Sequence, residues 1–317
     1  MRSRTRSSIL GAAALAVGCA GAPAGDAPPA PPAGARATAP SDSIPPVLAF
    51  HTCERLTLGA PGAVCVDFNG SVVLADGSPP RLVSYDPAAR SCQEFEAPAD
   101  RPAFRPSDVS IRGFFVYAVD EANRLLLRWD SSGAYRDVLL SFEELAERRR
   151  VSPYGLDVDT SGRIAITDVE NHQVLVLDTY LDVDVAFGNY GSFDGQLDTP
   201  QGVSFTPRGE LLVADTGNAR LQVFSDAGGF RRAIPPPDGV NPLRRPRRAV
   251  AGEDGRIFVA DPVAGRVFEF APDGRLARAI VPDAPGAFQP SDVALGRDGV
   301  LYVTDVASQT LYAIKVM

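Results

Sequence analysis

Two copies of a short acidic motif are the residues of this chain with the clearest potential for chemistry. The sequence Pro-Ser-Asp-Val occurs at residues 106–109 and again at 290–293, which places Asp108 and Asp292 in matching surroundings. Hard cations such as calcium take six to eight oxygen ligands, and two carboxylates could supply part of such a set. The same carboxylates could instead accept hydrogen bonds from loop backbone or pair with arginine.

Histidine chemistry is restricted because the chain has so few histidines. The only two are His51 and His172, so a zinc site with three histidine ligands is impossible. We find no Ser-His-Asp arrangement, no phosphate-binding glycine loop and no Cys-x-x-Cys pair. The sequence therefore lacks a concentrated catalytic set.

Arginine occurs in short clusters although the chain is acidic, with 31 basic and 39 acidic residues and a formal net charge of -8. A strongly acidic protein binds nucleic acid poorly, so we expect no nucleic-acid partner. The clusters could bind an anionic glycan, a lipid headgroup or an acidic protein, or they could be solvated side chains that balance neighbouring Asp and Glu. They comprise Arg101 and Arg105, Arg148–Arg150, Arg244 and Arg245, and Arg247 and Arg248.

The elements that must position these residues follow from a repeat of 44 to 48 residues. Each unit has a short apolar run that ends in aspartate, with another apolar run and a turn before it. A third run follows the aspartate, and then a turn and a fourth, weaker strand. Four short strands separated by polar turns are typical of a propeller blade, and blades must stack into a ring to bury both faces. We therefore predict an all-β, six-bladed β-propeller of four-stranded antiparallel blades. The repeated aspartates are Asp76, Asp120, Asp168, Asp215, Asp261 and Asp305.

These repeated aspartates are interpreted as structural. A short acidic side chain at a strand end accepts hydrogen bonds from the turn backbone, and Asn171, Asn218 and Arg220 would complete the network. The last unit ends at Met317 after its third strand, whereas an apolar segment at 46–58 precedes the first unit. We predict that this segment supplies the outer strand of the sixth blade and closes the ring.

The third and fourth units resemble the NHL repeat. Their inner strands begin with Pro-Tyr-Gly-Leu at 153–156 and Pro-Gln-Gly-Val at 200–203, and the turn at 215–220 reads Asp-Thr-Gly-Asn-Ala-Arg. The NHL pattern is Pro-x-Gly-Val, a glycine turn, and then Asp-x-x-Asn-x-Arg before an apolar strand. The resemblance covers residues 46–317 and implies a propeller without fixing its function, because such propellers serve as scaffolds, receptors and relatives of enzymes.

Sugar-lactone hydrolases of similar fold direct attention to the mouth of the central channel, where they hold calcium or zinc with Glu, Asn and Asp. The corresponding carboxylates here would be Asp108 and Asp292, where inner strands enter the channel. Tyr154, Gln201 and Arg248 are further candidates for ligand binding around this mouth. We expect no resident cofactor, with calcium at the two aspartates as the alternative.

The first eighteen residues resemble a bacterial lipoprotein signal peptide. Three arginines precede an apolar stretch that is too short to span a bilayer, and it ends in Leu-Ala-Val-Gly-Cys with Cys19 as the predicted acylation site. A plain secretory peptide or an uncleaved anchor is the alternative. Residues 19–45 are rich in Pro and Ala and are predicted to form a disordered tether, so the propeller would occupy 46–317. The protein would then be exported and lipid-anchored in the cell envelope, at the periplasmic or outer-membrane face.

Three cysteines remain beyond the predicted lipid anchor, and an oxidising compartment would permit one disulfide. Cys65 lies on a predicted inner strand and Cys92 on the outer strand of the same blade. Three strand spacings of about 4.8 Å separate them, which exceeds the reach of a disulfide. Any bridge should therefore involve Cys53, with either of the others as its partner.

The sequence favours a non-enzymatic binding or scaffold protein, expected to be a monomer, that presents one propeller face to a protein or glycan. The complete repeat and the lack of a concentrated catalytic set motivate this hypothesis. The alternative is a metal-dependent lactonase or lyase that uses calcium near Asp108 and Asp292. Such an enzyme would need three or more convergent oxygen ligands and an open coordination position.

Overall fold

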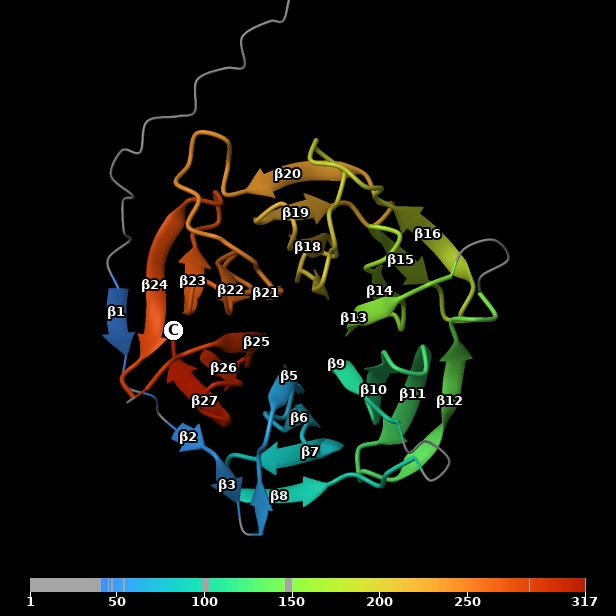
Figure 1. Cartoon of the computed structure of the whole chain (residues 1–317), viewed down its shortest axis with the longest axis vertical. Helices are drawn as coiled ribbons and strands as arrows, with labels where there is room; N and C mark the ends of the chain where they lie inside the picture. The colour runs from blue at the N-terminus through green and yellow to red at the C-terminus, as the bar shows by residue number, and fades with distance from the viewer. Residues whose placement is uncertain are drawn as a thin grey trace, which may run out of the picture. The chain divides into compact units, whose positions relative to one another are not determined.

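The computed structural model describes residues 41–44, 46, 48–53, 55–98, 103–145, 150–284 and 286–316. These residues contain no helix, and their strands form six blades around a central axis (Figure 1). The predicted all-β, six-bladed propeller is therefore confirmed. Since this part of the chain has no helix, it also offers no long apolar helix that could cross a membrane.

Each of the first three blades consists of four consecutive antiparallel strands. Blade 1 comprises β5 (Pro61–Val66), β6 (Val72–Gly77), β7 (Pro80–Asp86) and β8 (Ser91–Glu94). Blade 2 comprises β9 (Pro106–Arg112), β10 (Phe115–Asp120), β11 (Leu125–Asp130) and β12 (Tyr135–Ser141). Blade 3 comprises β13 (Pro153–Val158), β14 (Ile164–Asp168), β15 (Gln173–Leu177) and β16 (Val183–Phe187).

Blades 4 to 6 follow the same plan, and strands from the N-terminal segment are added to blades 5 and 6. Blade 4 comprises β17 (Val203–Phe205), β18 (Leu211–Asp215), β19 (Arg220–Phe224) and β20 (Phe230–Ile234). Blade 5 comprises β21 (Arg248–Ala251), β22 (Ile257–Asp261), β23 (Arg266–Phe270) and β24 (Leu276–Pro282). Blade 6 comprises β25 (Pro290–Leu295), β26 (Val300–Asp305) and β27 (Thr310–Lys315).

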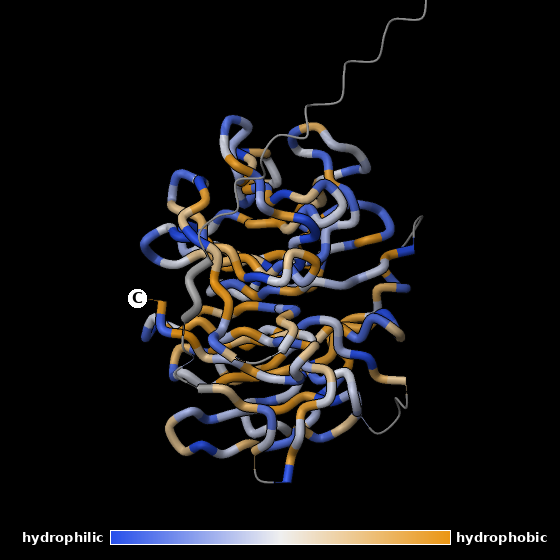
Figure 2. Tube along the Cα trace, turned by 60° about the vertical axis from the view of Figure 1, so that its left-hand side comes forward, coloured by the Kyte–Doolittle hydropathy of each residue, from blue (hydrophilic) through white to orange (hydrophobic). Residues whose placement is uncertain are grey.

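The hydrophobic core is divided among the spaces between adjacent blades. The second strands β14, β18 and β22 are buried at every residue, because each is covered on both faces by neighbouring blades. Figure 2 shows hydrophobic segments running through the blades and hydrophilic segments at the turns. The largest fully buried side chains include Trp129, Phe142, Phe224, Phe258 and Phe270.

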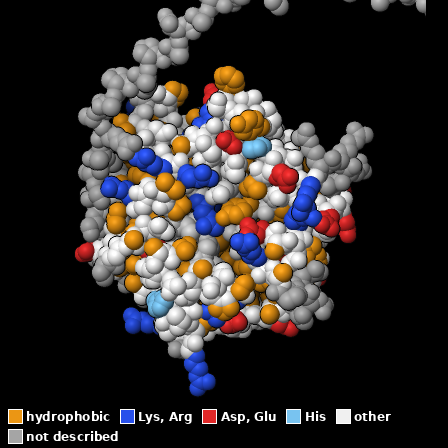
Figure 3. Space-filling model, viewed as in Figure 1, with side chains coloured by type: hydrophobic (Ala, Val, Ile, Leu, Met, Phe, Trp, Pro, Cys, Tyr) orange, Lys and Arg blue, Asp and Glu red, His pale blue; other side chains and the backbone are white. Residues whose placement is uncertain are grey.

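The inner strands β5, β9, β13, β17, β21 and β25 define two faces of the ring. We call the end at which loops lead into these strands the loop face, and the end at which short turns leave them the turn face. The repeated aspartates close the second strands and therefore lie on the loop face. In the view of Figure 3, Lys and Arg side chains gather near the centre of the ring, with hydrophobic side chains between them.

The ring is closed by the N-terminal segment, as predicted. Strand β2 (Leu48–Phe50) pairs antiparallel with β27 and completes blade 6. Strand β1 (Ser41–Ile44) pairs in parallel with β24 as a fifth strand of blade 5, although the predicted tether extends to residue 45. The outer edge of β24 offers free backbone groups to any extended segment, so this pairing needs no apolar pattern in the added strand.

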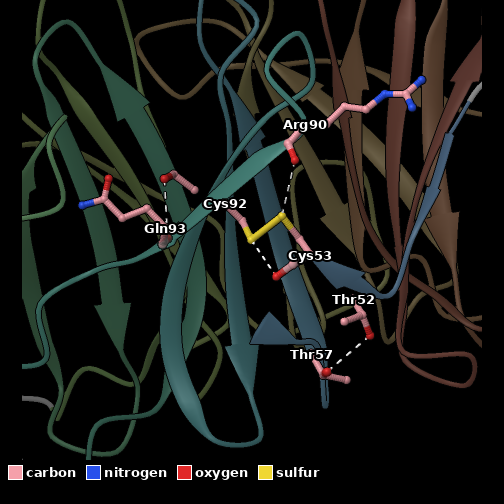
Figure 4. The surroundings of a disulfide bond; sticks show 7 residues. Thr52, Cys53, Thr57, Arg90, Cys92 and Gln93 are labelled. Atoms are coloured by element: carbon pink, nitrogen blue, oxygen red, sulfur yellow. Dashed lines mark hydrogen bonds between the residues drawn. A yellow bond between two sulfur atoms is a disulfide. The ribbon is translucent and has the colours of Figure 1, made fainter. Parts of the chain in front are cut away.

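A disulfide bond fastens the closed ring on its outer side. Strands β3 (Thr52–Cys53) and β4 (Leu56–Thr57) form a small hairpin, and Cys53 is bonded to Cys92 on β8 (Figure 4). The prediction that Cys53 takes part is confirmed, and its partner is Cys92 because the hairpin lies along the outer strand of blade 1. Cys65, on inner strand β5, is a free and buried thiol.

Candidate functional site

The six repeated aspartates hold the loops of the loop face in place. All six are buried, and each accepts a backbone N–H from the loop that leads into its own blade. Asp215 accepts the amide of Asp198 at 2.7 Å and the side chains of Asn218 and Arg220 at 2.9 and 2.8 Å. Equivalent bonds join Ala60 to Asp76, Arg105 to Asp120, Ser152 to Asp168, Arg244 to Asp261 and Gln289 to Asp305, and Asn171 donates to Asp168.

The glycines of the two NHL-like inner strands allow neighbouring blades to approach closely. A Cβ atom on Gly155 would lie 2.1 Å from the carbonyl oxygen of Gln201. A Cβ atom on Gly202 would lie 2.4 Å from the carbonyl oxygen of Arg247. Any other residue at these positions would push blades 3, 4 and 5 apart around the channel.

Asp108 and Asp292 bind the neighbouring blade. Asp108 accepts the amide of Leu156 in blade 3 at 2.7 Å, and Asp292 accepts the amide of Val64 in blade 1 at 2.8 Å. Each aspartate also accepts the amide of the valine that follows it. The motif serines act alike, since Ser107 donates to the carbonyl of Tyr154 and Ser291 to that of Pro61. The Pro-Ser-Asp-Val motif therefore links one inner strand to the next.

Arg248 completes a charged group that blocks the channel. Its side chain is only 7% exposed, and Nη1 donates to Asp108 at 2.7 Å and to the carbonyl of Leu156 at 2.9 Å. Its Nε lies 3.8 Å from Asp292 and has no hydrogen-bond partner among the described residues. Asp157 accepts the amide of Phe205 in blade 4 and faces the same arginine. We call Asp108, Asp157, Arg248 and Asp292 the channel cluster.

The channel cluster holds three carboxyl groups against one guanidinium. Burial raises the pKa of Asp108, Asp157 and Asp292, and that of Asp292 reaches about 7 with a further contribution from Asp108. Burial alone would lower the pKa of Arg248, but the three aspartates raise it above its ordinary value. Arg248 therefore stays charged, while Asp292 retains a proton over much of the range below pH 7.

All five predicted mouth residues line one cavity at the loop-face end of the channel: Asp108, Tyr154, Gln201, Arg248 and Asp292. The structure thus brings the predicted set together. However, the volume of this cavity is about 10 Å³, which is room for about one water molecule. Arg247 lies over the Tyr154 ring, with its guanidinium carbon 5.5 Å from the ring centroid, and fills the mouth further.

The two motif aspartates form the backbone and arginine contacts that the sequence left open as the alternative to ligand binding. Their oxygens accept hydrogen bonds from backbone of the same and the next blade, because an inner strand leaves N–H groups unpaired on the channel side. Within the described ranges, no group of three or more His, Cys, Asp or Glu side chains is placed to hold a metal ion. The sequence could not reveal this, because both hydrogen-bond partners lie in other blades.

A much larger cavity, about 690 Å³, opens at the turn-face end of the channel. Its lining includes Arg248 and, in blades 1 to 4, the residues two positions beyond the point where each inner strand enters the channel: Cys65, Ser110, Asp157 and Ser204. Sequence reasoning missed these residues because it considered only where each strand enters the channel. The two-residue period of a β-strand is the signal that could have found them.

The structure describes some of the arginines in the predicted clusters, and they differ in whether they form ion pairs. Arg101, Arg148 and Arg149 lie outside the described residues, as does the predicted acylation site Cys19. Arg105 pairs with Glu121 at 3.0 Å. Arg150, Arg244 and Arg245 are exposed on the loop face and form no ion pair with any described residue.

A family model for the NHL repeat matches residues 152–177 and 197–224, in blades 3 and 4. The chain is a six-bladed β-propeller that carries NHL repeats. The matched segments contain the Asn171, Asn218 and Arg220 side chains that bind the turn aspartates. The Asn and Arg positions of the NHL motif thus correspond here to hydrogen bonds that hold the loops of the loop face.

Curated relatives match this NHL propeller over parts of their length. The B-box type zinc finger protein ncl-1 of Caenorhabditis elegans is 44% identical over 45 residues, which are 14% of this chain and 5% of that protein. Protein brain tumor of Drosophila melanogaster is 26% identical over 132 residues, 41% of this chain and 12% of that protein. Protein SUPPRESSOR OF QUENCHING 1, chloroplastic, of Arabidopsis thaliana is 25% identical over 282 residues, 76% and 26% respectively. The chain thus spans well under half of these relatives.

Solved structures share the fold of the NHL propeller at low sequence identity. A gluconolactonase from Xanthomonas campestris has a TM-score of 0.62 at 17% identity, covering 82% of this chain and 87% of that chain. A chain of a nidogen/laminin complex has a TM-score of 0.58 at 14% identity, covering 76% and 92%. A streptogramin B lyase has a TM-score of 0.61 at 11% identity, covering 84% and 96%. Similarity at this level shows the fold alone.

Proposed function

We propose that this NHL propeller is a non-enzymatic binding protein that docks an acidic partner protein on its loop face. The observation that carries the proposal is the filled mouth of the channel, where only about 10 Å³ remains. A filled mouth makes the loop face a continuous surface, which suits a macromolecule better than a small substrate. The exposed Arg244 and Arg245, which have no ion pair among the described residues, supply the charge that an acidic partner would match.

Exposed aromatic side chains on another loop of the loop face strengthen the proposal. Tyr190 and Phe193 are 69% and 78% exposed, on the loop that leads from blade 3 into blade 4. Tyrosine, phenylalanine and arginine are enriched in the centres of protein interfaces. A glycan could bind the same arginines and stack on the same rings, so the experiment below distinguishes a glycan from a protein.

The loop that carries these aromatic residues is held rigid by the NHL turn of blade 4. Asn218 donates to the carbonyl of Gly191, Arg220 to that of Phe193, and Gln222 to that of Gln196, at 2.6 to 2.8 Å. A preorganised loop loses less conformational entropy on binding than a flexible one. The NHL residues would therefore serve binding indirectly, by fixing the loop that presents Tyr190 and Phe193.

The experiment is site-specific photo-crosslinking in cells that make the protein. A photoreactive amino acid replaces Phe193 on the loop face or, as the control, Tyr180, which is 85% exposed at the turn between β15 and β16 on the turn face. The proposal expects one discrete, protease-sensitive adduct from position 193 and none from position 180. Arg244→Glu with Arg245→Glu should abolish it, whereas Arg231→Glu on outer strand β20 should not. An adduct that resists protease but not glycosidase would overturn the protein partner in favour of a glycan.

We also propose that the propeller is a monomer tethered to a bacterial envelope membrane through acylated Cys19. The motif before this cysteine and the Pro-rich segment after it support the anchor. Labelling with radioactive palmitate should mark the wild-type protein and not Cys19→Ser, and the variant should leave the membrane fraction. Labelling of the variant, or its continued membrane attachment, would contradict the anchor. Light scattering of the detergent-purified protein would check the monomer.

A further inference from the structure

The turn-face cavity has the size and construction of a small-molecule site. Its volume of about 690 Å³ falls within the range of roughly 300–1,000 Å³ that such sites occupy. All six blades contribute to its lining, so its walls are parts of rigid strands and short turns. An adjoining hollow of about 660 Å³ shares part of the lining and extends toward the exposed ring of Phe68.

The charges that line this turn-face cavity are nearly balanced. The lining includes Arg112, Arg163, Arg208 and Arg248 on one side and Asp157, Asp159 and Glu253 on the other. Arg163 is bonded to Asp159 at 2.8 Å, and Arg248 is bonded to Asp108 at 2.7 Å. Since neither sign predominates, the cavity would attract neither a strongly anionic nor a strongly cationic ligand.

The lining of the turn-face cavity nevertheless includes charged side chains that have no ion-pair partner among the described residues. Arg112, Arg208 and Glu253 line it and form no ion pair with any described residue. A hydroxyl group both donates and accepts, so a ligand with several hydroxyls would satisfy such a mixture. The half-buried Phe205 also lines the wall, with the guanidinium carbon of Arg163 5.5 Å from the centroid of its ring.

We propose that the turn-face cavity binds the end of a neutral glycan, that is, a short uncharged oligosaccharide. Hydroxyls of the terminal sugar would accept from Arg112 and Arg208 and donate to Glu253. This site is distinct from the proposed protein-docking surface, because the two lie at opposite ends of the channel. The test of this site is therefore independent of the loop-face proposal.

The test is calorimetric titration of the full chain, purified in detergent, with a panel of defined probes. The neutral probes are maltotriose, cellotriose, lactose and N,N′-diacetylchitobiose, and the charged probes are citrate and spermidine. The proposal expects at least one neutral probe to bind with one-to-one stoichiometry. Its dissociation constant should change less than about twofold between low and high salt, because no net charge is neutralised.

Matched variants locate the binding. Glu253→Gln should weaken the bound neutral probe about tenfold, as expected for a lost hydrogen bond to a charged group. Glu170→Gln, an exposed glutamate on the loop face, should leave its dissociation constant unchanged. The proposal is overturned if no neutral probe binds, if citrate or spermidine binds more tightly than every neutral probe, or if Glu253→Gln and Glu170→Gln weaken binding equally.

Discussion

The two ends of the propeller channel are lined by the same six inner strands, yet about 10 Å³ is open at the loop face and about 690 Å³ at the turn face. At the loop-face end, Asp108 and Asp292 have their oxygens occupied by backbone amides of adjacent blades. At the turn-face end, Glu253 and Arg208 stand without ion pairs among the described residues. The motif aspartates, which suggest chemistry in the sequence, thus hold neighbouring blades together. The cavity large enough for a ligand is instead lined by residues that belong to no sequence motif.

Removal of the central cation should have the largest effect on stability. Arg248→Met should lower the free energy of unfolding by about 3–5 kcal/mol, because it leaves buried carboxylates without their counter-charge. Urea denaturation would measure the loss. Arg245→Met, on the exposed loop face, is the control and should change stability by less than about 0.5 kcal/mol. A loss at Arg248 as small as that of the control would mean that the cluster does not hold the ring.

The raised pKa of Asp292 should make the stability of the protein depend on pH. Because its pKa is about 7 in the folded protein and 3.8 ordinarily, the folded state binds the proton more tightly between pH 4 and 7. The free energy of unfolding should therefore fall as pH rises through this window, by at most about 1.4 kcal/mol per pH unit, and level off above it.

Asp292→Asn isolates this contribution, because the variant lacks the carboxyl group of Asp292. Urea denaturation at pH 5, 6, 7 and 8 should give a flatter profile for the variant, at lower absolute stability. The account of the buried carboxyl would be wrong if the two profiles were parallel.

Disturbing the close packing of the inner strands at the loop-face end should lower the free energy of unfolding by a smaller amount. Gly155→Ala should cost about 1–3 kcal/mol, since the added Cβ would lie 2.1 Å from the Gln201 carbonyl oxygen. Gly62 is the matched inner-strand control, because a Cβ there would meet no atom closer than 3.8 Å. Thermal unfolding should show a lower midpoint for Gly155→Ala and little change for Gly62→Ala. Equal shifts for the two variants would argue against blade packing as the reason for the repeated glycine.

The smallest effect is expected at the turn-face cavity. Glu253→Gln and Arg208→Gln should each change the free energy of unfolding by less than about 0.5 kcal/mol, because both side chains are exposed and lack ion pairs among the described residues. Urea denaturation would check this beside the Arg248 variant. A loss above about 1 kcal/mol would mean that these residues support the fold as the loop-face cluster does.

The repeat made the fold predictable from the sequence, because six aspartates at regular spacing mark six units that cannot bury both faces alone. Ring closure by the segment before Cys53 followed from the missing fourth strand of the last unit. The convergence of Tyr154, Gln201 and Arg248 with the two motif aspartates also followed, because each stands where an inner strand enters the channel.

The contacts that fill the loop-face end of the channel could not be predicted in the same way. That Asp108 accepts the amide of Leu156 depends on the register between blades, which no local pattern in either strand encodes. The reach of Arg247 across to Tyr154 likewise depends on the diameter of the ring. The sequence did not predict the turn-face cavity, because its lining residues, such as Asp157 and Glu253, belong to no shared motif.

A double-mutant cycle between Arg248 and Asp108 tests most directly whether the channel cluster is structural. Urea denaturation of the wild type, Arg248→Met, Asp108→Asn and the double variant gives the interaction energy of the pair. Because the two side chains are 2.7 Å apart and buried, we predict a coupling of about 2–3 kcal/mol, with the double variant more stable than Arg248→Met. Additive losses within about 0.5 kcal/mol would contradict the account and would return Asp108 to the candidates for ligand binding.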